Sequence, residues 1–403
     1  MSESSILTLV EARLGRKNLP VSLELWNGQT LELGKAAKVK VALRTPAALA
    51  HLAKPTLGKL AQCYVEEQID LEGDAQDILS LGTAFCDAHI GVWKSKKNLW
   101  GWLSHSKRFD KQAISYHYDV SNDFYALWLD HNRVYSCAYF KNPDDSLDSA
   151  QRQKLEHICR KLNLQEGERF LDIGCGWGGL IMWAATHYRT RSVGVTLSKN
   201  QYDYIKNQIH ERGLQEYCQV YLCDYRDLDE TEQFDKIASV GMFEHVGKKN
   251  LGLYFQKIYR LLKPGGLIMN HGITAATKYT EGLGSDVGEF INRYVFPGGE
   301  LVHLSRVVDE MSKAKLECLD VESLRPHYAK TLWHWVGRLE TNYQEAKRLV
   351  GERKFRIWRI YMAGSAHAFE CGWMSIYQIL CAKPLENGSV AYPLTREHVY
   401  LPR

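Results

Sequence analysis

The sequence predicts an α/β fold with a helix-covered sheet, a smaller N-terminal α+β domain and a largely helical C-terminal segment. Between residues 147 and 271, apolar runs typical of buried strands alternate with helical periodicity, which indicates a parallel sheet covered on both faces. Residues 21–44 instead alternate apolar and polar side chains, as strands with one exposed face do. From about Leu301 to Lys383 the pattern is helical and rich in Trp.

The N-terminal region is predicted to begin with a hairpin. Asn27-Gly28 lies between two alternating runs, and this dipeptide is the strongest short hairpin signal. After Pro46 the pattern becomes helical through about Cys86. These elements together predict a small α+β unit.

The middle of the chain is predicted to contain five strands separated by helices. A helix at 147–162 comes first, because apolar residues recur there at helical spacing. The strands are 169–173, 192–195, 219–223, 234–240 and 266–271. The helices between them are a segment that ends at Tyr188, then 200–212 and 250–262.

Composition excludes several classes of protein. The 403 residues are 45% hydrophobic and 24% charged, as in ordinary globular proteins, and the net charge is only +4. No nucleic-acid partner and no metal site are expected. No window offers about 20 consecutive apolar residues, and the first residues do not read as a secretory signal. None of the 10 Cys forms a C-x-x-C pair, so a cytosolic protein with free thiols is expected.

Residues 94–112 are predicted to form a basic linker that also carries aromatic side chains. Lys96, Lys97, Lys107 and Arg108 are interleaved with residues such as Trp100, Trp102 and Phe109. This mixture suits an anionic membrane surface. A solvated linker whose Trp residues pack on the next domain explains it equally well, and both interpretations stay open.

The stretch "LDIGCGWGGL" at 171–180 has the glycine spacing G-x-G-x-x-G, which is typical of dinucleotide-binding loops. Such a site needs an acidic residue at the end of the second strand to bind the ribose. That place reads "GVTLSKNQ" here and contains neither Asp nor Glu. In addition, Asp172 precedes the first glycine by two residues, and Asp224 follows the third strand. With "LLKPGGLI" at 261–268, these features resemble the class I S-adenosylmethionine-dependent methyltransferases, whose fold is Rossmann-like.

Four further stretches are more specific. They are "YHYDVSNDFYALWL" (116–129), "VYSCAYF" (134–140), "VGMFEHVGKKN" (240–250) and "YVFPGG" (294–299). They resemble the cyclopropane-fatty-acyl-phospholipid synthases, over roughly residues 60–385. "IDLEGD" (69–74) is similar to the N-terminal domain of that family. The resemblance implies a lipid- or membrane-interacting domain at 1–112 and a catalytic domain at 113–403.

The resemblance also implies an activity. Members of the family transfer the methyl carbon of S-adenosylmethionine to the cis double bond of unsaturated phospholipid acyl chains. A cyclopropane ring then forms through a carbocation that a bound bicarbonate ion deprotonates. A homodimer is expected, cytoplasmic and peripherally associated with the inner face of the membrane, with the phospholipid bilayer as its partner.

Site residues carry over from the family motifs. The implied cofactor-binding residues are Tyr135, Ser136, Asp172, Gly174, Cys175, Gly176, Gly178, Thr196, Gln201, Asp224 and Tyr225. The implied catalytic residues, which hold the bicarbonate, are Glu244, His271 and Tyr328 through their side chains and Cys137 and Ile273 through their backbone. A carboxylate among donors suits this ion, because the bicarbonate O–H can donate to Glu244 while His271 and Tyr328 donate to its oxygens.

The sequence departs from the family in two places. Ser365 in "MAGSAHAF" stands where some members carry Cys, and "AQCYVEEQ" at 61–68 replaces the usual stretch of the N-terminal domain.

Purely structural interpretations also exist for the site residues. Glu244 can cap a helix that starts near Lys249, His271 can be a buried core residue, and His245 is expected to be one. Cys137 is expected to be a small buried hydrophobe rather than a nucleophile.

The alternatives at the level of function are an acyl or amine methyltransferase without ring closure, and a non-catalytic lipid-binding module.

Overall fold

The computed structural model describes residues 19–33, 36–86, 121–277, 285–296 and 300–401, together with Thr8, Val10 and Ala12. The chain divides into two compact units. Unit 1 comprises Met1–Lys97, Tyr279–Pro297 and Leu332–Trp373, and unit 2 comprises Asn98–Lys278, Gly298–Thr331 and Met374–Arg403.

This division differs from the predicted single boundary near residue 112. Two segments from the second half of the chain pack with N-terminal residues, so unit 1 is discontinuous in sequence. The predicted basic linker at 94–112 lies wholly within 87–120, which is outside the described residues, and its two interpretations stay predictions.

Unit 1 is built on a four-stranded sheet of order β2-β1-β3-β4. Its strands are β1 (Val21–Glu24), β2 (Thr30–Leu33), β3 (Val39–Leu43) and β4 (Ile69–Glu72). β1 and β2 pair antiparallel around the Asn27-Gly28 turn, where Gly28 has φ +85°, so the predicted hairpin is confirmed. β1 and β3 are parallel, and β4 closes the sheet antiparallel to β3.

The helices of unit 1 come from three parts of the chain. They are α2 (Pro46–Ala53), α3 (Leu57–Val65), α4 (Ala75–Cys86), α12 (Ser285–Tyr294), α15 (Tyr343–Glu370) and the C-terminal part of α14 (Arg325–Thr341). α15 contains a break at Gly351, whose φ of +78° is not helical.

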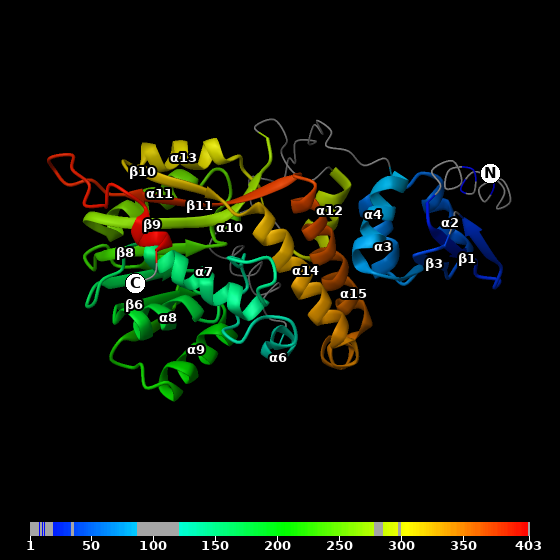
Figure 1. The fold of residues 1–403 in the computed structure, drawn as a ribbon, viewed down its shortest axis with the longest axis horizontal. Coiled ribbons are helices and arrows are strands. Elements are labelled where there is room, and N and C mark those ends of the chain that lie inside the picture. The colour runs from blue at the N-terminus through cyan, green and yellow to red at the C-terminus, as the bar shows by residue number, and fades with distance from the viewer. Residues whose placement is uncertain are drawn as a thin grey trace. The chain divides into compact units, whose positions relative to one another are not determined.

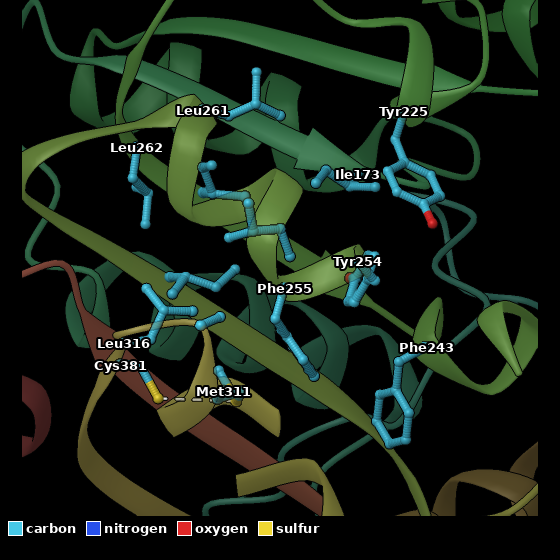
Figure 2. Close-up of a cluster of buried hydrophobic side chains, with 14 of the residues drawn as sticks. Ile173, Tyr225, Phe243, Tyr254, Phe255, Leu261, Leu262, Met311, Leu316 and Cys381 are labelled. Atoms are coloured by element: carbon cyan, nitrogen blue, oxygen red, sulfur yellow. Dashed lines mark hydrogen bonds between the residues drawn. The ribbon is translucent and has the colours of Figure 1, made fainter. Parts of the chain in front are cut away.

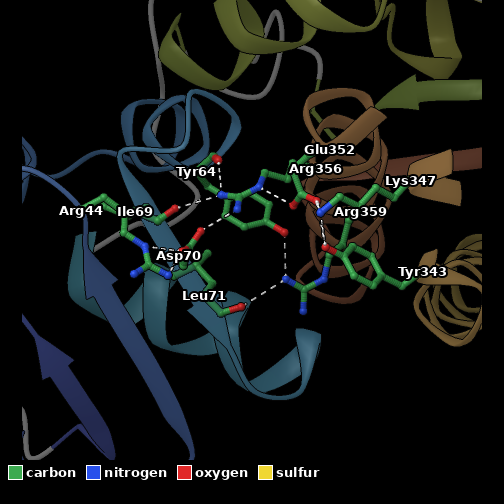
Figure 3. A network of polar contacts seen from close by, with 10 residues as sticks. All are labelled: Arg44, Tyr64, Ile69, Asp70, Leu71, Tyr343, Lys347, Glu352, Arg356 and Arg359. Carbon is green, nitrogen blue, oxygen red and sulfur yellow. Dashed lines mark hydrogen bonds and ion pairs between the residues drawn. The ribbon is translucent and has the colours of Figure 1, made fainter. Parts of the chain in front are cut away.

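Two arginines on α15 explain why this helix from the C-terminal half of the chain packs against N-terminal residues in unit 1 (Figure 3). Arg356 donates to the carbonyls of Tyr64 at 3.0 Å and Ile69 at 3.2 Å and pairs with Asp70 at 2.6 Å. Arg359 donates to the Tyr64 hydroxyl at 3.1 Å. The Arg356–Asp70 ion pair is partly buried, with side chains 11% and 19% exposed, so it is screened less by solvent than a surface pair. These contacts therefore fix α15 against α3 and β4.

Unit 2 contains a seven-stranded sheet of order β10-β11-β9-β8-β5-β6-β7. The strands are β5 (Arg169–Ile173), β6 (Arg191–Thr196), β7 (Cys218–Leu222), β8 (Phe234–Val240), β9 (Leu262–Ala275), β10 (Glu317–Ser323) and β11 (Met374–Ala382). β5 to β9 pair in parallel, which confirms the parallel sheet predicted for this region.

The prediction of five strands was incomplete. β10 and β11 come from the segment that was predicted to be largely helical, and they extend the sheet antiparallel beyond β9. β11 is buried almost throughout, so its sequence "MSIYQILCA" lacks the alternation of a half-exposed strand. An apolar run of this kind cannot be told from a buried helix by periodicity alone.

Helices cover both faces of this sheet. They are α7 (Leu147–Lys161), α8 (Gly179–Tyr188), α9 (Lys199–Glu211), α11 (Leu251–Leu261) and α13 (Leu304–Lys313), with the short α6 (Asn122–Ala126), η1 (Tyr225–Asp227), α10 (Phe243–Val246) and α16 (Glu397–Tyr400). Successive strand residues take opposite sides: Leu171 and Ile173 belong to one buried cluster with residues of α11 and α13, whereas Phe170 belongs to a second cluster with residues of α7 and α8. Figure 2 draws Ile173 in the first cluster, together with Tyr254 and Phe255 of α11.

Two further findings concern the chain as far as it is described. No helix there is long and apolar enough to cross a membrane. All ten cysteines are free thiols, as predicted.

Candidate active site

A cavity of about 130 Å³ lies in unit 2 at the carboxyl ends of β5, β6 and β8. Ligands of open α/β sheets bind at this edge, because loops and helix N-termini meet there. Most of the predicted cofactor residues line the cavity. They are Tyr135, Ser136, Asp172, Gly174, Cys175, Gly176, Thr196, Gln201 and Tyr225.

The glycine-rich loop forms one wall because it turns sharply after β5. Gly174 and Gly176 have φ of +78° and +53°, a region that side chains with a Cβ rarely adopt. A Cβ at Gly176 would meet no atom within 4 Å, so the backbone here borders open space. A ligand can therefore approach the backbone closely at this point.

Thr196 at the end of β6 and Gln201 in α9 also line the cavity. The Thr196 hydroxyl donates to Gln201 Oε1 at 2.7 Å, and both residues are buried. With its oxygen engaged, Gln201 retains its amide N–H groups as donors for a ligand. At the end of β6, where a dinucleotide-binding site carries an Asp or Glu for the ribose, this chain therefore has the neutral side chains of Thr196 and Gln201.

Asp172 supplies the negative charge of the cavity. Its side chain is 2% exposed, and Oδ1 has no hydrogen-bond partner among the described residues. Burial raises the pKa of this carboxyl to about 7, while the nearby Lys154 ammonium acts in the opposite direction. A buried carboxylate with an open oxygen suits a cationic or hydrogen-donating ligand.

Lys154 is a cavity residue that the sequence reasoning missed. It lies on the buried side of α7, and its ammonium donates to the Ser136 hydroxyl at 3.0 Å. Burial lowers the pKa of Lys154 to about 8, while Asp130 and Asp172 favour its charged form. A lysine amid the apolar positions of a helix was the available signal, because Lys is almost never fully buried unless paired.

Two further residues line the cavity, one within the loop expected to contact the cofactor and one that was expected to be a core residue. Trp177 within the glycine loop lines the cavity and donates through its indole N–H to Asn122 at 2.8 Å. His245 was expected to be a packed core residue, but it is only partly buried and lines the cavity. The short α10 turns His245 toward this side while the adjacent Glu244 is buried.

Two predicted cofactor residues do not line the cavity. Asp224 caps η1, accepting from the Arg226 amide at 2.9 Å, and pairs with the Arg226 guanidinium at 2.6 Å. Gly178 is the N-cap of α8, with Ile205 about 3.0 Å from where its Cβ would lie. Both residues shape neighbouring elements, and the structure gives no cavity contact for either.

The predicted catalytic residues lie beside the cavity rather than in its lining. Glu244 is 9% exposed, and its Oε1 accepts from the Ile273 amide on β9 at 2.6 Å. Glu244 therefore does not cap the next helix, whose N-cap is Asn250. Glu244 Oε2 is buried and unpartnered within the described part of the chain. Burial raises the pKa of Glu244 to about 7.

His271, on the same strand β9 as Ile273, offers a second buried polar atom without a partner among the described residues. His271 and Ile273 are two residues apart on β9, so their side chains lie on the same face of the sheet. His271 is 1% exposed, with Nδ1 3.3 Å from the Gln378 amide nitrogen and Nε2 unpartnered among described residues. Burial lowers the pKa of His271 well below its ordinary value, so the ring is neutral.

Cys137 and Tyr328 are brought together by the carbonyl of Leu324. The Tyr328 amide donates to it at 3.0 Å, and the Cys137 thiol lies 3.8 Å from it. Leu324 in turn donates to the carbonyl of Ile376, whose neighbour across the sheet is Ile273. Burial raises the pKa of the Cys137 thiol, which makes it a buried hydrophobe and not a nucleophile.

These residues fit S-adenosylmethionine. The open carboxylate oxygen of Asp172 suits the ammonium group of its amino-acid part, and Gly176 leaves room for close approach to the backbone. Tyr135, Trp177 and Tyr225 offer apolar faces to its rings and sulfonium.

Comparisons with known proteins agree with this geometry. A family described as mycolic acid cyclopropane synthetase matches residues 105–379, and a domain of unknown function matches residues 14–88. A probable fatty acid methyltransferase from Pseudomonas putida is 46% identical over 385 residues, covering 95% of this chain and 97% of the relative. The cyclopropane-fatty-acyl-phospholipid synthase of Escherichia coli is 39% identical over 277 residues, which cover 68% of each protein.

A solved structure is also similar in fold. The mycolic acid cyclopropane synthase CmaA1 complexed with SAH and CTAB gives a TM-score of 0.64 at 35% identity, covering 68% of this chain and 98% of that one. The family match spans more than half of the chain, and it extends over the cavity and the Glu244 region. The chain therefore belongs to the mycolic acid cyclopropane synthetase family of class I S-adenosylmethionine-dependent methyltransferases.

Proposed function

We propose that this protein transfers the methyl carbon of S-adenosylmethionine to the cis double bond of unsaturated phospholipid acyl chains and closes a cyclopropane ring. The observation that carries this proposal is the pair of open buried atoms, Glu244 Oε2 and His271 Nε2, beside a methyl-donor cavity. Simple methylation of an amine needs no such buried acceptor and donor next to the donor site.

The reaction first requires the double bond of the acyl chain to be aligned with the methyl group of the donor, because an alkene is a poor nucleophile. S-adenosylmethionine supplies a strongly electrophilic methyl group when it is bound. Asp172 and Gln201 would hold its polar parts, and Gly176 would let it approach the backbone. A fixed near-attack geometry can contribute about 7–11 kcal/mol to the rate.

The second requirement is a dry environment that tolerates positive charge on the acyl chain. Tyr135 packs against Tyr125 and Trp128 with ring centroids 5.7 and 5.4 Å apart, and Tyr125 contacts Trp177 at 4.7 Å. Tyr135 and Trp177 line the cavity, so this aromatic cluster would border a methyl donor bound there. Aromatic faces stabilise a desolvated cation by about 2 kcal/mol or more.

The third requirement is removal of one proton so that the ring can close. Glu244 and His271 would hold a bicarbonate ion, which supplies a base that is less prone to stable alkylation than a protein carboxylate. Glu244 Oε2 would accept the O–H of this ion, and His271 Nε2, with the neutral ring in the suitable tautomer, would donate to one of its oxygens. The Ile273 amide already donates to Glu244, so we assign Ile273 to orienting that carboxylate. Tyr328 and the Cys137 backbone remain proposed ligands of the same ion.

We place the substrate at a membrane surface. An acyl chain of a phospholipid is available only in a bilayer, so peripheral association with the inner face of the membrane is part of the proposal. The predicted homodimer also stays a proposal, and light scattering of the purified protein at several concentrations tests it.

A second candidate is a fatty-acyl methyltransferase that stops before ring closure. The observation in its favour is that the relative covering 95% of this chain is named a probable fatty acid methyltransferase. The two candidates share the cofactor cavity and differ in whether the Glu244 region completes the reaction.

Lipid mass spectrometry separates the candidates. The purified protein is incubated with S-adenosylmethionine and vesicles of monounsaturated phospholipid, and the products are hydrogenated mildly before analysis. Ring formation adds one CH2 and removes the reducible double bond, whereas a methyl-branched alkene remains reducible. Activity should fall in buffer stripped of carbon dioxide and return on adding bicarbonate. Ring formation that ignores bicarbonate would overturn the assigned base, and absence of any methylated lipid would overturn the proposed function.

A further inference from the structure

A row of polar side chains crosses three neighbouring strands of unit 2, and none of its members lines the cofactor cavity. Glu322 on β10 is paired in register with Gln378 on β11, and Gln378 is paired with His271 on β9. Directly opposed residues of antiparallel strands project from the same face of the sheet. Two positions along from His271 and Gln378, Met269 and Leu380 belong to the buried cluster that includes residues of α7. The row therefore lies on the face that α7 covers.

Helix α7 brings three basic side chains to this face. Lys154, His157 and Lys161 recur at helical spacing, and all three are buried. Glu322 Oε2 lies 2.7 Å from His157 Nε2 and 2.5 Å from Lys161 Nζ. Burial opposes ionisation of Glu322, but His157 and Lys161 lower its pKa to about 2. The carboxylate at the β10 end of the row is thus held by α7.

Gln378 occupies the middle of the row and separates this carboxylate from His271. Its side chain is fully buried, and its amide nitrogen lies 3.3 Å from His271 Nδ1. An amide nitrogen can only donate, so Nδ1 is the acceptor in this arrangement. Burial and the basic groups of α7 keep the pKa of His271 well below its ordinary value, although Glu322 acts in the opposite direction. The neutral ring has a single N–H, which must then be on Nε2.

We propose that Gln378 is a positioning residue that holds His271 in the tautomer with its proton on Nε2, so that this atom can donate to an oxyanion. The inference rests on the proposed function, which assigns His271 to holding bicarbonate. His271 Nε2 is buried and has no partner among the described residues, so it is the ring atom left for a ligand. With the proton on Nδ1 instead, Nε2 would present a lone pair, which repels the oxygens of an anion.

NMR spectroscopy reads the tautomer directly. The full-length protein is labelled with ¹⁵N at the ring nitrogens of its 15 histidines, and the signals that disappear in His271→Gln identify His271. Protonated and unprotonated ring nitrogens differ widely in ¹⁵N chemical shift. At neutral pH, Nε2 of His271 should be protonated and Nδ1 unprotonated. A proton on Nδ1 would overturn the proposal, because the amide of Gln378 would then present its oxygen to the ring.

Two variants test whether Gln378 sets this tautomer. Gln378→Met removes the hydrogen bond, so both tautomers should be populated. Gln378→Glu keeps the shape, but an ionised carboxylate only accepts, so at alkaline pH the proton of His271 should move to Nδ1. As the pH falls, the Glu–His pair takes up one proton, and Nε2 becomes protonated again whichever of the two groups holds it.

Asn270→Asp is the matched control for the spectra. Asn270 is also a fully buried amide, and it adjoins His271 on β9, but successive strand residues project from opposite faces. This variant should leave the signals of His271 unchanged. Thermal melting verifies that each variant is folded, and the spectrum of the parent protein tests the tautomer without any variant. Unchanged His271 signals in both Gln378 variants would contradict the assignment.

The pH profile of activity shows whether the tautomer matters to the reaction. At alkaline pH, ring formation by Gln378→Glu should fall by about tenfold or more relative to the parent, the scale of loss when a ligating His loses its hydrogen-bond partner. The ratio of variant to parent should recover as the pH falls, and S-adenosylmethionine affinity should not change. Bicarbonate availability also changes with pH, but it does so equally for both proteins. A ratio that is independent of pH would reduce Gln378 to a packing role.

The outcomes for the two proposals can be told apart. The expected tautomer in a protein that forms no cyclopropane would refute the proposed function and keep Gln378 as the residue that orients the ring. Ring formation by a protein whose His271 carries its proton on Nδ1 would keep the proposed function and refute the role of Gln378.

Discussion

Replacing Glu244 by Gln is expected to make the protein more stable at alkaline pH while it destroys ring formation. The reason is that Glu244 is buried, and its Oε2 has no partner among the described residues. Burial raises its pKa from 4.5 to about 7, which corresponds to about 3 kcal/mol of destabilisation once the carboxyl is ionised. The amide of Gln keeps the acceptor for Ile273 but leaves its NH2 group unpartnered, at about 1 kcal/mol. The net gain is about 2 kcal/mol.

The pH dependence follows from the direction of the shift. The folded state holds the proton more tightly than the unfolded chain, so the penalty is absent below pH about 4.5, grows between about 4.5 and 7, and is complete above that range. At pH about 4.5 or below the parent carboxyl is neutral and only the cost of the unpartnered Gln NH2 group remains, so Glu244→Gln should melt roughly 2–4 °C lower than the parent, the effect of about 1 kcal/mol. At pH about 8 the variant should melt roughly 4–8 °C higher, the effect of about 2 kcal/mol in a domain of 150–250 residues.

Glu216→Gln is the control for this experiment, because Glu216 is exposed and the same chemical change there should leave the melting temperature unchanged. Ring formation by Glu244→Gln should fall by about 10²-fold or more, the usual scale for loss of a general-base system. Cofactor affinity, measured by calorimetry, should change little. Identical melting of parent and variant at pH about 8, or near-normal ring formation, would refute the reasoning.

Three further expectations concern other parts of the chain. Gly176→Val should abolish S-adenosylmethionine binding by calorimetry, because its side chain would occupy the open space at a φ of +53°; normal binding by the folded variant would exclude the loop as the cofactor site. Lys154→Met should lower the free energy of unfolding by about 1–3 kcal/mol, the cost of leaving a buried polar group uncompensated, because the nearby ammonium favours the ionised form of Asp172, and adding Asp172→Asn should restore part of it in urea titrations. If the double variant recovers none of the lost stability, the charge of Asp172 does not depend on Lys154. Neutralising Lys96, Lys97, Lys107 and Arg108 should weaken binding to anionic vesicles at low salt and spare cofactor affinity, whereas unchanged vesicle sedimentation would discard the membrane interpretation of that segment.

Sequence alone determined the elements whose signal is local. β5 and β8 begin and end at the predicted residues, 169–173 and 234–240, because short apolar runs between helical segments mark strands of a parallel sheet. The Asn27-Gly28 hairpin followed from the chemistry of a two-residue turn signal. The glycine spacing and the neutral residues Thr196 and Gln201 separated a methyl-donor site from a dinucleotide site before any geometry was known.

Tertiary structure decided everything that depends on contacts between distant segments. β11 joins the sheet by pairing with β9, and β10 joins it by pairing with β11. These pairings are long-range, and the sequence of the almost fully buried β11 shows no strand periodicity that would reveal them. The assignment of 332–373 to unit 1 depends on Arg356 and Arg359 meeting β4 and α3, far away in sequence. The open oxygens of Asp172 and Glu244, the buried charge of Lys154 and the cofactor cavity are likewise properties of packing. Hydrogen-bond satisfaction and desolvation are set by neighbours in space, whereas a sequence records neighbours along the chain.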